Sequence, residues 1–200
     1  MATIEESAFA AIDFESAGAA RGRTDVPVQI AIAHWEPGAG FGEEFVSYLR
    51  ADQPITWTAR KVHGITETDT AGAPALLSLW PQIKRLLSDR ILTAHGHGTE
   101  KRFLRAFPGH SFGPWIDTLL LSRAAWPDLP DHSLGALCKQ FGLVTALDRR
   151  FPERRFHDAL YDSAASILLL EHLLGELGLE KQPLDLLLRP DIGDWVRLRR

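Results

Sequence analysis

The chain of 200 residues contains one cysteine, Cys138, and this scarcity excludes an internal disulfide and a zinc site built from cysteines. A chain without disulfides suits a reducing compartment, so we expect a cytoplasmic protein. Cys138 lies in the apolar stretch from Leu134 to Phe141. That position favours a packed core thiol over a nucleophile.

Long hydrophobic runs are also missing. The longest apolar region, Ser166 to Leu179, contains three polar residues and is too short to cross a bilayer. The N-terminus carries Glu5 and Glu6 in place of the basic start and apolar stretch of a signal peptide. We therefore expect a soluble intracellular protein with no membrane partner.

The chain also lacks an excess of positive charge. The net charge is -4 and the pI is about 6.1, so no overall basic field indicates nucleic acid as a ligand. An acidic metal site can, however, offset local basic patches, so the net charge does not exclude such a ligand. With 45% hydrophobic and 24% charged residues, the chain has enough apolar material for one full core.

The order of predicted elements indicates an α/β fold. Three strands come first, at residues 7–14, 26–35 and 42–49, and their close succession favours antiparallel pairing. Helices then alternate with two short strands: we expect helices over 73–88, 100–107, 118–126, 133–141 and 157–177, and strands over 91–94 and 115–117. This order predicts a mixed five-stranded sheet flanked by helices. Residues 180–200, with two prolines and a basic end, look like a separate small appendage.

Two carboxylates, Asp13 and Glu15, end the first apolar strand. Side chains two apart on a strand share a face, so both acids point the same way. Adjacent carboxylates repel each other and are costly to desolvate, so the pair needs a compensating positive charge. A divalent cation is the usual one. A solvated strand end is the alternative for an isolated pair.

Further motifs follow in a fixed order. They are Val62-His63-Gly64-Ile65-Thr66, Ala94-His95, Asp117-Thr118-Leu119, His132-Ser133-Leu134 and His157-x-Ala159-x-x-Asp162. Together with Asp13-x-Glu15, this set resembles the DEDDh 3′-5′ exonucleases, a family that includes ribonuclease T and the proofreading subunit of bacterial DNA polymerase III. Each motif alone is weak, but six in order form a specific signal. The resemblance runs from about residue 8 to about residue 176.

The resemblance implies a ribonuclease H-like fold, with an exonuclease domain over residues 1–179 and a tail over 180–200. It implies hydrolysis of phosphodiester bonds at the 3′ end of single-stranded DNA or RNA with two Mg²⁺ or Mn²⁺ ions. The implied metal ligands, which are also catalytic residues, are Asp13, Glu15, Glu100 and Asp162. His157 would take the proton from the attacking water. Two-metal hydrolysis is consistent with this donor set, because hard cations prefer oxygen ligands.

The second acidic segment departs from the family pattern. The family has Ala-His-Asn, two or three residues, then Phe-Asp, whereas this chain has Gly96, Thr99 and Glu100 in place of Asn, Phe and Asp. Glutamate keeps the charge and adds one methylene, so the loop would have to adjust by about 1.5 Å. Gly96 and Gly98 make the loop permissive enough for that shift.

Substrate contacts are also implied by the resemblance. Ser16 and Gly18 would approach the terminal nucleotide, and Val62 and His63 would line its pocket. Arg154 and Arg155 flank His157 and are placed to hold phosphates, although a solvated surface explains an arginine-rich loop equally well. Four tryptophans are candidates for base stacking, and none is assigned, because most such residues belong to cores: Trp57, Trp80, Trp115 and Trp126.

Two other functions remain open at this point. One is an end-binding module derived from a nuclease, in which the altered loop around Glu100 has abolished turnover. The other is an adaptor subunit of a polymerase or repair assembly, with the basic tail as its docking element. The sequence decides neither between DNA and RNA nor between a monomer and a homodimer.

Overall fold

A five-stranded sheet forms the centre of the computed structural model, which describes residues 2–19, 22–109 and 111–198. Its strands are β1 (Phe9–Ser16), β2 (Pro27–Glu36), β3 (Gly40–Tyr48), β4 (Ile91–Ala94) and β5 (Trp115–Asp117), in the spatial order β3-β2-β1-β4-β5. The pairs β1–β2 and β2–β3 are antiparallel, and β1–β4 and β4–β5 are parallel. The predicted mixed sheet is confirmed.

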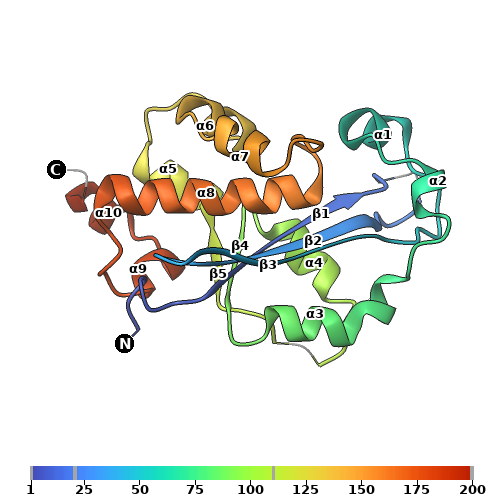
Figure 1. Cartoon of the computed structure of the whole chain (residues 1–200), viewed down its shortest axis with the longest axis horizontal. Helices are drawn as coiled ribbons and strands as arrows, with labels where there is room; N and C mark the ends of the chain where they lie inside the picture. The colour runs from blue at the N-terminus through green and yellow to red at the C-terminus, as the bar shows by residue number, and fades with distance from the viewer. Residues whose placement is uncertain (1, 20–21, 110, 199–200) are drawn as a thin grey trace.

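Helices cover both faces of this sheet (Figure 1). They are α1 (Trp57–His63), α2 (Glu67–Thr70), the 3-10 segment η1 (Leu76–Leu79), α3 (Trp80–Leu87), α4 (Gly98–Leu104), α5 (Thr118–Ala125), α6 (Leu134–Gln140), α7 (Val144–Arg150), α8 (Ala159–Leu177), α9 (Asp185–Leu188) and α10 (Ile192–Leu198). Helix α8 runs along one face with α5, α6 and α7 beyond it, and α3 and α4 lie on the other face. Helix α1 lies beside the end of β1.

The pleat of β1 decides where its acidic side chains point. Phe9 and Ala11 pack into the cluster that includes residues of α8, whereas Ala10 and Ile12 pack against α3 and α4. Both faces of the strand are therefore buried. Since side chains alternate along a strand, Asp13 and Glu15 continue the α8 face. Figure 1 shows that the N-terminal end of α8 lies over the C-terminal end of β1.

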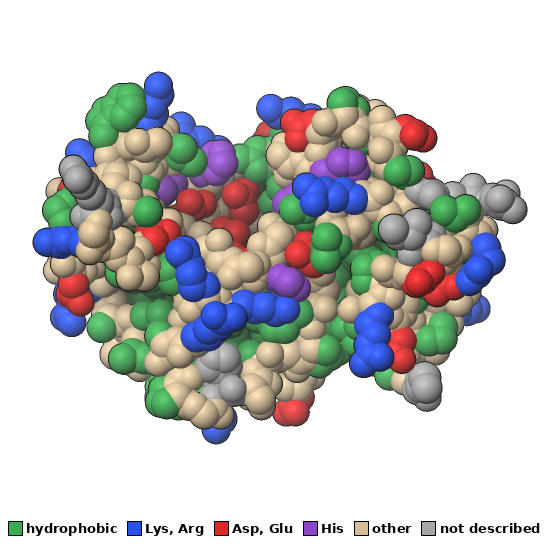
Figure 2. All heavy atoms as spheres, turned by 180° about the vertical axis from the view of Figure 1, so that it is seen from behind, with side chains coloured by type: hydrophobic (Ala, Val, Ile, Leu, Met, Phe, Trp, Pro, Cys, Tyr) green, Lys and Arg blue, Asp and Glu red, His purple; other side chains and the backbone are tan. Residues whose placement is uncertain are grey.

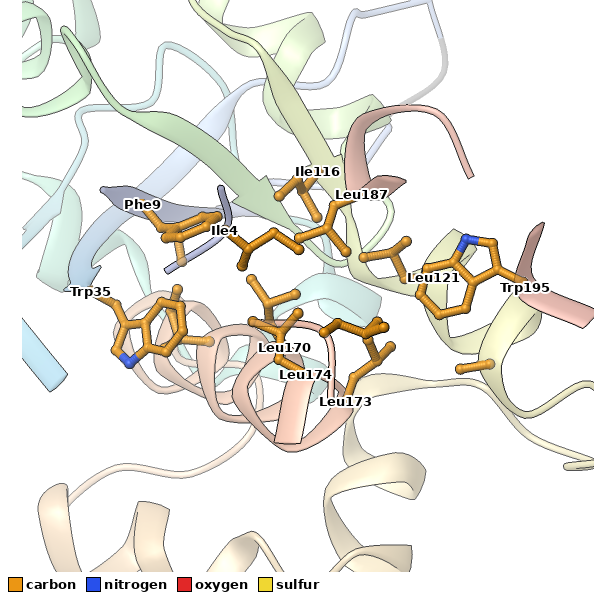
Figure 3. Packing of buried hydrophobic residues seen from close by; sticks show 14 residues of the cluster. Ile4, Phe9, Trp35, Ile116, Leu121, Leu170, Leu173, Leu174, Leu187 and Trp195 are labelled. Atoms are coloured by element: carbon orange, nitrogen blue, oxygen red, sulfur yellow. The ribbon is translucent and has the colours of Figure 1, made fainter. Parts of the chain in front are cut away.

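The C-terminal segment packs against the same core. Leu187 and Trp195 are buried in one cluster with Ile4, Phe9 and Leu170 (Figure 3). An isolated bridge also pairs Thr3 with Pro183. The segment predicted as an appendage thus shares the apolar layer between the sheet and α8, and a domain boundary at residue 179 stays a prediction.

Three predicted local boundaries were wrong. The expected helix over 73–88 is a 3-10 turn followed by α3, because Pro81 lacks an N–H and is accommodated only in the first helical turn. The helix expected from residue 157 begins at Ala159, and His157 precedes it with φ 69°. The helix expected over 100–107 is α4, which begins at Gly98 and ends at Leu104.

Cys138 is fully buried among Ala31, Leu147 and their neighbours, so the prediction of a packed core thiol is confirmed. Burial raises the pKa of this thiol to about 12. In the part of the chain that the structure describes, no helix has both the length and the apolar character needed to span a membrane.

Candidate active site

Four carboxylates from three elements converge at the C-terminal end of β1. Asp13 and Glu15 come from β1, Glu100 from the first turn of α4, and Asp162 from the first turn of α8. The charge of each of the other three acts on Asp13, which places all four within electrostatic range. Figure 2 shows acidic side chains at the bottom of a hollow, with histidine side chains on its wall.

Burial makes these acids hard to ionise together. Burial raises the pKa of Glu15 to about 8, and the negative charges of Asp162, Asp158 and Glu100 add to the shift. Burial likewise raises the pKa of Glu100 and of Asp162 to about 7, and that of Asp13 well above its usual range. Four such groups can all be ionised only beside a compensating positive charge.

The donor set fits a hard divalent cation. Glu100 is 4% exposed, and its Oε2 atom has no hydrogen-bond partner; the Oδ1 atom of Asp162 is likewise buried and unpartnered. Among residues 2–19, 22–109 and 111–198, no lysine or arginine forms an ion pair with any of the four carboxylates. Unpaired buried carboxylate oxygens are costly, and they are the ligands that Mg²⁺ and Mn²⁺ prefer.

His157 lies at the edge of this cluster. One of its ring nitrogens and carboxylate oxygens of Glu15 and Asp162 all lie within 4.8 Å of one another. Its backbone N–H donates to Oδ2 of Asp162 at 3.1 Å. The φ of 69° is uncommon for a residue with a side chain, and such strain often accompanies a functional position. The side chain is exposed, so it can reach both the cluster and solvent.

Two residues that the sequence analysis missed hold the start of α8 on the sheet. Gln29, which is 2% exposed and pairs with Glu15 across β1 and β2, accepts from the Ala159 N–H at 3.0 Å. Its amide donates to Asp158 at 3.2 Å, and Asp158 caps α8 by accepting from two backbone N–H groups of the first turn. A glutamine inside the apolar run of residues 28–33 was the available signal.

Asp117 holds the loop that leads to Glu100. Its carboxylate caps α5 by accepting from Leu119 and Leu120, and it also accepts from the backbone N–H groups of Gly96 and His97 at 3.0 and 3.3 Å. These contacts tie the loop at Gly96 and His97 to the start of α5.

His95, although part of a family motif, has both ring nitrogens engaged within the fold. Nε2 donates to the His132 carbonyl oxygen at 2.8 Å, and Nδ1 lies 3.0 Å from the Thr118 hydroxyl. Burial lowers the pKa of His95, which favours the neutral ring. This histidine therefore joins loops and is not free to bind a ligand.

The residues predicted to contact substrate line two cavities beside the acidic cluster. One, of about 460 Å³, is lined by Glu15, Ser16, Gly18, Val62 and His63 among others. A Cβ atom at Gly18 would collide with the Thr56 side chain, so only glycine allows this close approach. The other cavity, of about 440 Å³, is lined by His63, Arg154, Arg155 and His157 among others.

The polar side chains in these cavities differ in whether they already have hydrogen-bond or ion-pair partners within the protein. His63 donates from Nε2 to the Ser16 carbonyl oxygen at 3.0 Å and accepts at Nδ1 from Ile65, and burial lowers its pKa. Arg154 pairs with Asp158 at 2.6 Å. Arg155 is exposed and forms no ion pair in the described residues. Arg155 is therefore the freer of the two arginines to meet a phosphate.

Sequence comparison shows the family to which the chain belongs. The model of the RNase T family, described as exonuclease, matches residues 10–170. The chain belongs to this family of DEDDh 3′-5′ exonucleases. A DNA polymerase III subunit epsilon-like protein of Rhodobacter capsulatus is 31% identical over 179 residues, and a PolC-type DNA polymerase III of Streptococcus thermophilus is 28% identical over 172 residues. These matches cover 87% and 84% of this chain but 25% and 11% of the two relatives.

Solved structures show the same fold. Exonuclease X in complex with 5′ overhanging duplex DNA has a TM-score of 0.67 at 27% identity, covering 86% of this chain and 96% of that one. The nuclease domain of 3′hExo, a DEDDh family member bound to rAMP, has a TM-score of 0.68 at 17% identity, covering 88% and 95%. The second likeness concerns the fold alone. The predicted ribonuclease H-like fold is confirmed.

Proposed function

We propose that this chain is a metal-dependent 3′-5′ exonuclease that removes nucleotides from the 3′ ends of single-stranded DNA or RNA. The observation that supports this most directly is the convergence of Asp13, Glu15, Glu100 and Asp162, of which Glu100 and Asp162 each have a buried oxygen without a hydrogen-bond partner. Family membership supports the reaction type. The two neighbouring cavities provide space for a terminal nucleotide.

In this proposal the chain's own residues position the reactants. The cavity lined by Ser16 and Val62 holds the terminal nucleotide, and Arg155 meets a phosphate oxygen. His157 accepts the proton of the attacking water at a ring nitrogen, which its exposed position and its place beside Glu15 allow. Histidine is the side chain most often used for proton transfer near neutral pH.

The four carboxylates would hold two divalent cations, Mg²⁺ or Mn²⁺. Bound there, such ions stabilise the charge on the attacking and leaving oxygens of the phosphodiester. In this proposal Glu100 replaces the shorter family aspartate as a ligand. Its burial and its unpartnered Oε2 atom support that role.

The experiment is an end-resolved nuclease assay. Single-stranded DNA and RNA oligonucleotides labelled at the 5′ end are incubated with the protein in Mg²⁺, in Mn²⁺ and in EDTA. We expect a ladder of products shortened from the 3′ end in either metal and none in EDTA. Comparing the two substrates also decides between DNA and RNA.

Variants connect the activity to the site. Asp13→Ala should abolish shortening, and Glu100→Gln, which preserves shape and removes charge, should slow it by at least about 100-fold. Unchanged shortening by Glu100→Gln in Mn²⁺ would remove Glu100 from the site. Metal-dependent protection of a 3′ end without any product would contradict the enzyme proposal and identify an end-binding module instead.

A further inference from the structure

Trp57 differs from the other tryptophans in its environment. It is 73% exposed, whereas Trp35 and Trp195 are buried in the core. Trp80 stacks on Phe107 with ring centroids 4.9 Å apart, and Trp126 lies 4.4 Å from Phe141. Within the described residues, none of the contacts between aromatic rings involves Trp57.

The position of Trp57 relative to the candidate active site makes this exposure informative. A single exposed apolar side chain is ordinary on a protein surface and needs no explanation. Trp57, however, is the first residue of α1, and Thr58 and Val62 of the same helix line the 460 Å³ cavity that contains Glu15. Val62 is itself 47% exposed. Trp57 does not itself line the cavity, but both of its neighbours in sequence, Thr56 and Thr58, do, so Trp57 lies beside it.

Lys61 adds a positive charge to the same surface. It lies one helical turn after Trp57, and its Nζ atom is 5.2 Å from the centre of the Trp57 ring. In the described part of the chain Lys61 forms no ion pair, whereas the neighbouring Arg60 is paired with Glu67. Figure 2 shows the lobe at the upper left with hydrophobic and basic side chains at its summit, next to the acidic hollow.

We propose that Trp57 and Lys61 form a platform on which a base of the single strand stacks, next to the terminal nucleotide in the active site. The tryptophan ring offers the stacking face and Lys61 meets the adjoining phosphate. An exposed aromatic ring with an unpaired cation, beside a cavity of about 460 Å³, has the composition of a surface that binds single-stranded nucleic acid. A second protein would have no need of a nucleotide-sized cavity at the edge of the platform.

This inference rests on the proposed exonuclease function and adds a specificity: the enzyme should require an unpaired base upstream of the one it removes. Stacking acts on the bound strand before and during the reaction, so its loss should raise KM and leave kcat nearly unchanged. Alanine substitution of a stacking aromatic weakens binding by roughly 5- to 150-fold. We expect Trp57→Ala to raise KM within this range.

The test measures kcat and KM for shortening of a single-stranded oligothymidine by the wild type, Trp57→Ala, Trp57→Phe and Leu77→Ala. Leu77 is 57% exposed in η1 and does not line either cavity, so Leu77→Ala is the matched control. We expect Trp57→Phe to retain most of the affinity, since it keeps a ring. Trp57 is largely exposed, so its substitution should leave folding intact, which thermal unfolding verifies.

An abasic substitution scan identifies the base involved. Oligothymidines with one abasic site, moved stepwise from the second nucleotide at the 3′ end, are compared between the wild type and Trp57→Ala. At one position the loss of affinity from the abasic site and the loss from Trp57→Ala should not add, because each substitution removes the same contact between the base and the ring. A KM of Trp57→Ala equal to that of Leu77→Ala, or additive losses at every position, would overturn the platform. If the wild type shortens no oligonucleotide at all, the proposed function itself fails.

Discussion

Asp117 offers the sharpest stability test of the site architecture. Its side chain is 10% exposed, and its carboxylate accepts from four backbone N–H groups: Gly96, His97, Leu119 and Leu120. Two of these belong to the start of α5 and two to the loop that leads into α4. Asp117→Ala removes the acceptor of all four N–H groups in one step, whereas Asp117→Asn keeps the Oδ1 position that accepts from three of them.

The expected cost follows from these contacts. Loss of the α5 cap costs about 1 kcal/mol, and two half-buried N–H groups of the loop lose their acceptor at about 1 kcal/mol each. The free energy of unfolding should therefore fall by about 3 kcal/mol for Asp117→Ala, which corresponds to about 6–12 °C in Tm for a chain of this size. Asp117→Asn should lose about 1 kcal/mol, because asparagine caps helices nearly as well as aspartate.

Urea unfolding followed by tryptophan fluorescence measures these differences. Asp131→Ala is the matched control, because Asp131 is an exposed loop aspartate that accepts from the backbone and the side chain of one residue, Ser133. Its substitution should cost less than about 0.5 kcal/mol. If Asp117→Ala and Asp131→Ala destabilise the protein equally, the four contacts of Asp117 do not hold the loop and the reasoning fails. Exonuclease activity provides a second measurement, since a displaced loop should also displace Glu100.

Three further predictions follow from the buried groups. In EDTA, the free energy of unfolding should fall as pH rises from about 4 to about 8, because the pKa values of Glu15 and its neighbours are raised and the folded chain therefore binds more protons than the unfolded chain. Saturating Mn²⁺ should remove this loss of stability. A Tm that rises with pH in EDTA would contradict the prediction. His157→Gly should reduce the rate of shortening by about 10²- to 10⁴-fold. Its Tm should stay equal or rise, because glycine adopts the left-handed backbone conformation without strain. A loss of stability in parallel with the loss of activity would indicate a structural role for His157. Cys138, with its pKa raised to about 12, should resist iodoacetamide at pH 8 and react only after unfolding in urea; rapid alkylation of the folded protein would show that its burial is not maintained.

The sequence alone was sufficient to predict the sheet and the family. Apolar runs that end in carboxylates, such as residues 9–15, predict buried strands, and the ordered motifs predicted the family. The residues at which the helices begin were harder to predict from the sequence. The helical pattern of the sequence extends across the left-handed backbone of His157 and across the 3-10 turn before Pro81, so it does not show where α8 and α3 begin.

Only the tertiary structure decided which polar groups act together. Gln29 and Asp158 are 129 residues apart, and they meet because α8 crosses β2 at its first turn. The same holds for the tryptophans: Trp57 and Trp80 both begin helices, yet one is exposed beside a cavity and the other is stacked on Phe107. Composition and local spacing determine which face of an element is apolar. Whether that face finds a partner depends on elements far away in the chain, and this is why the positions of these side chains became known only from the folded structure.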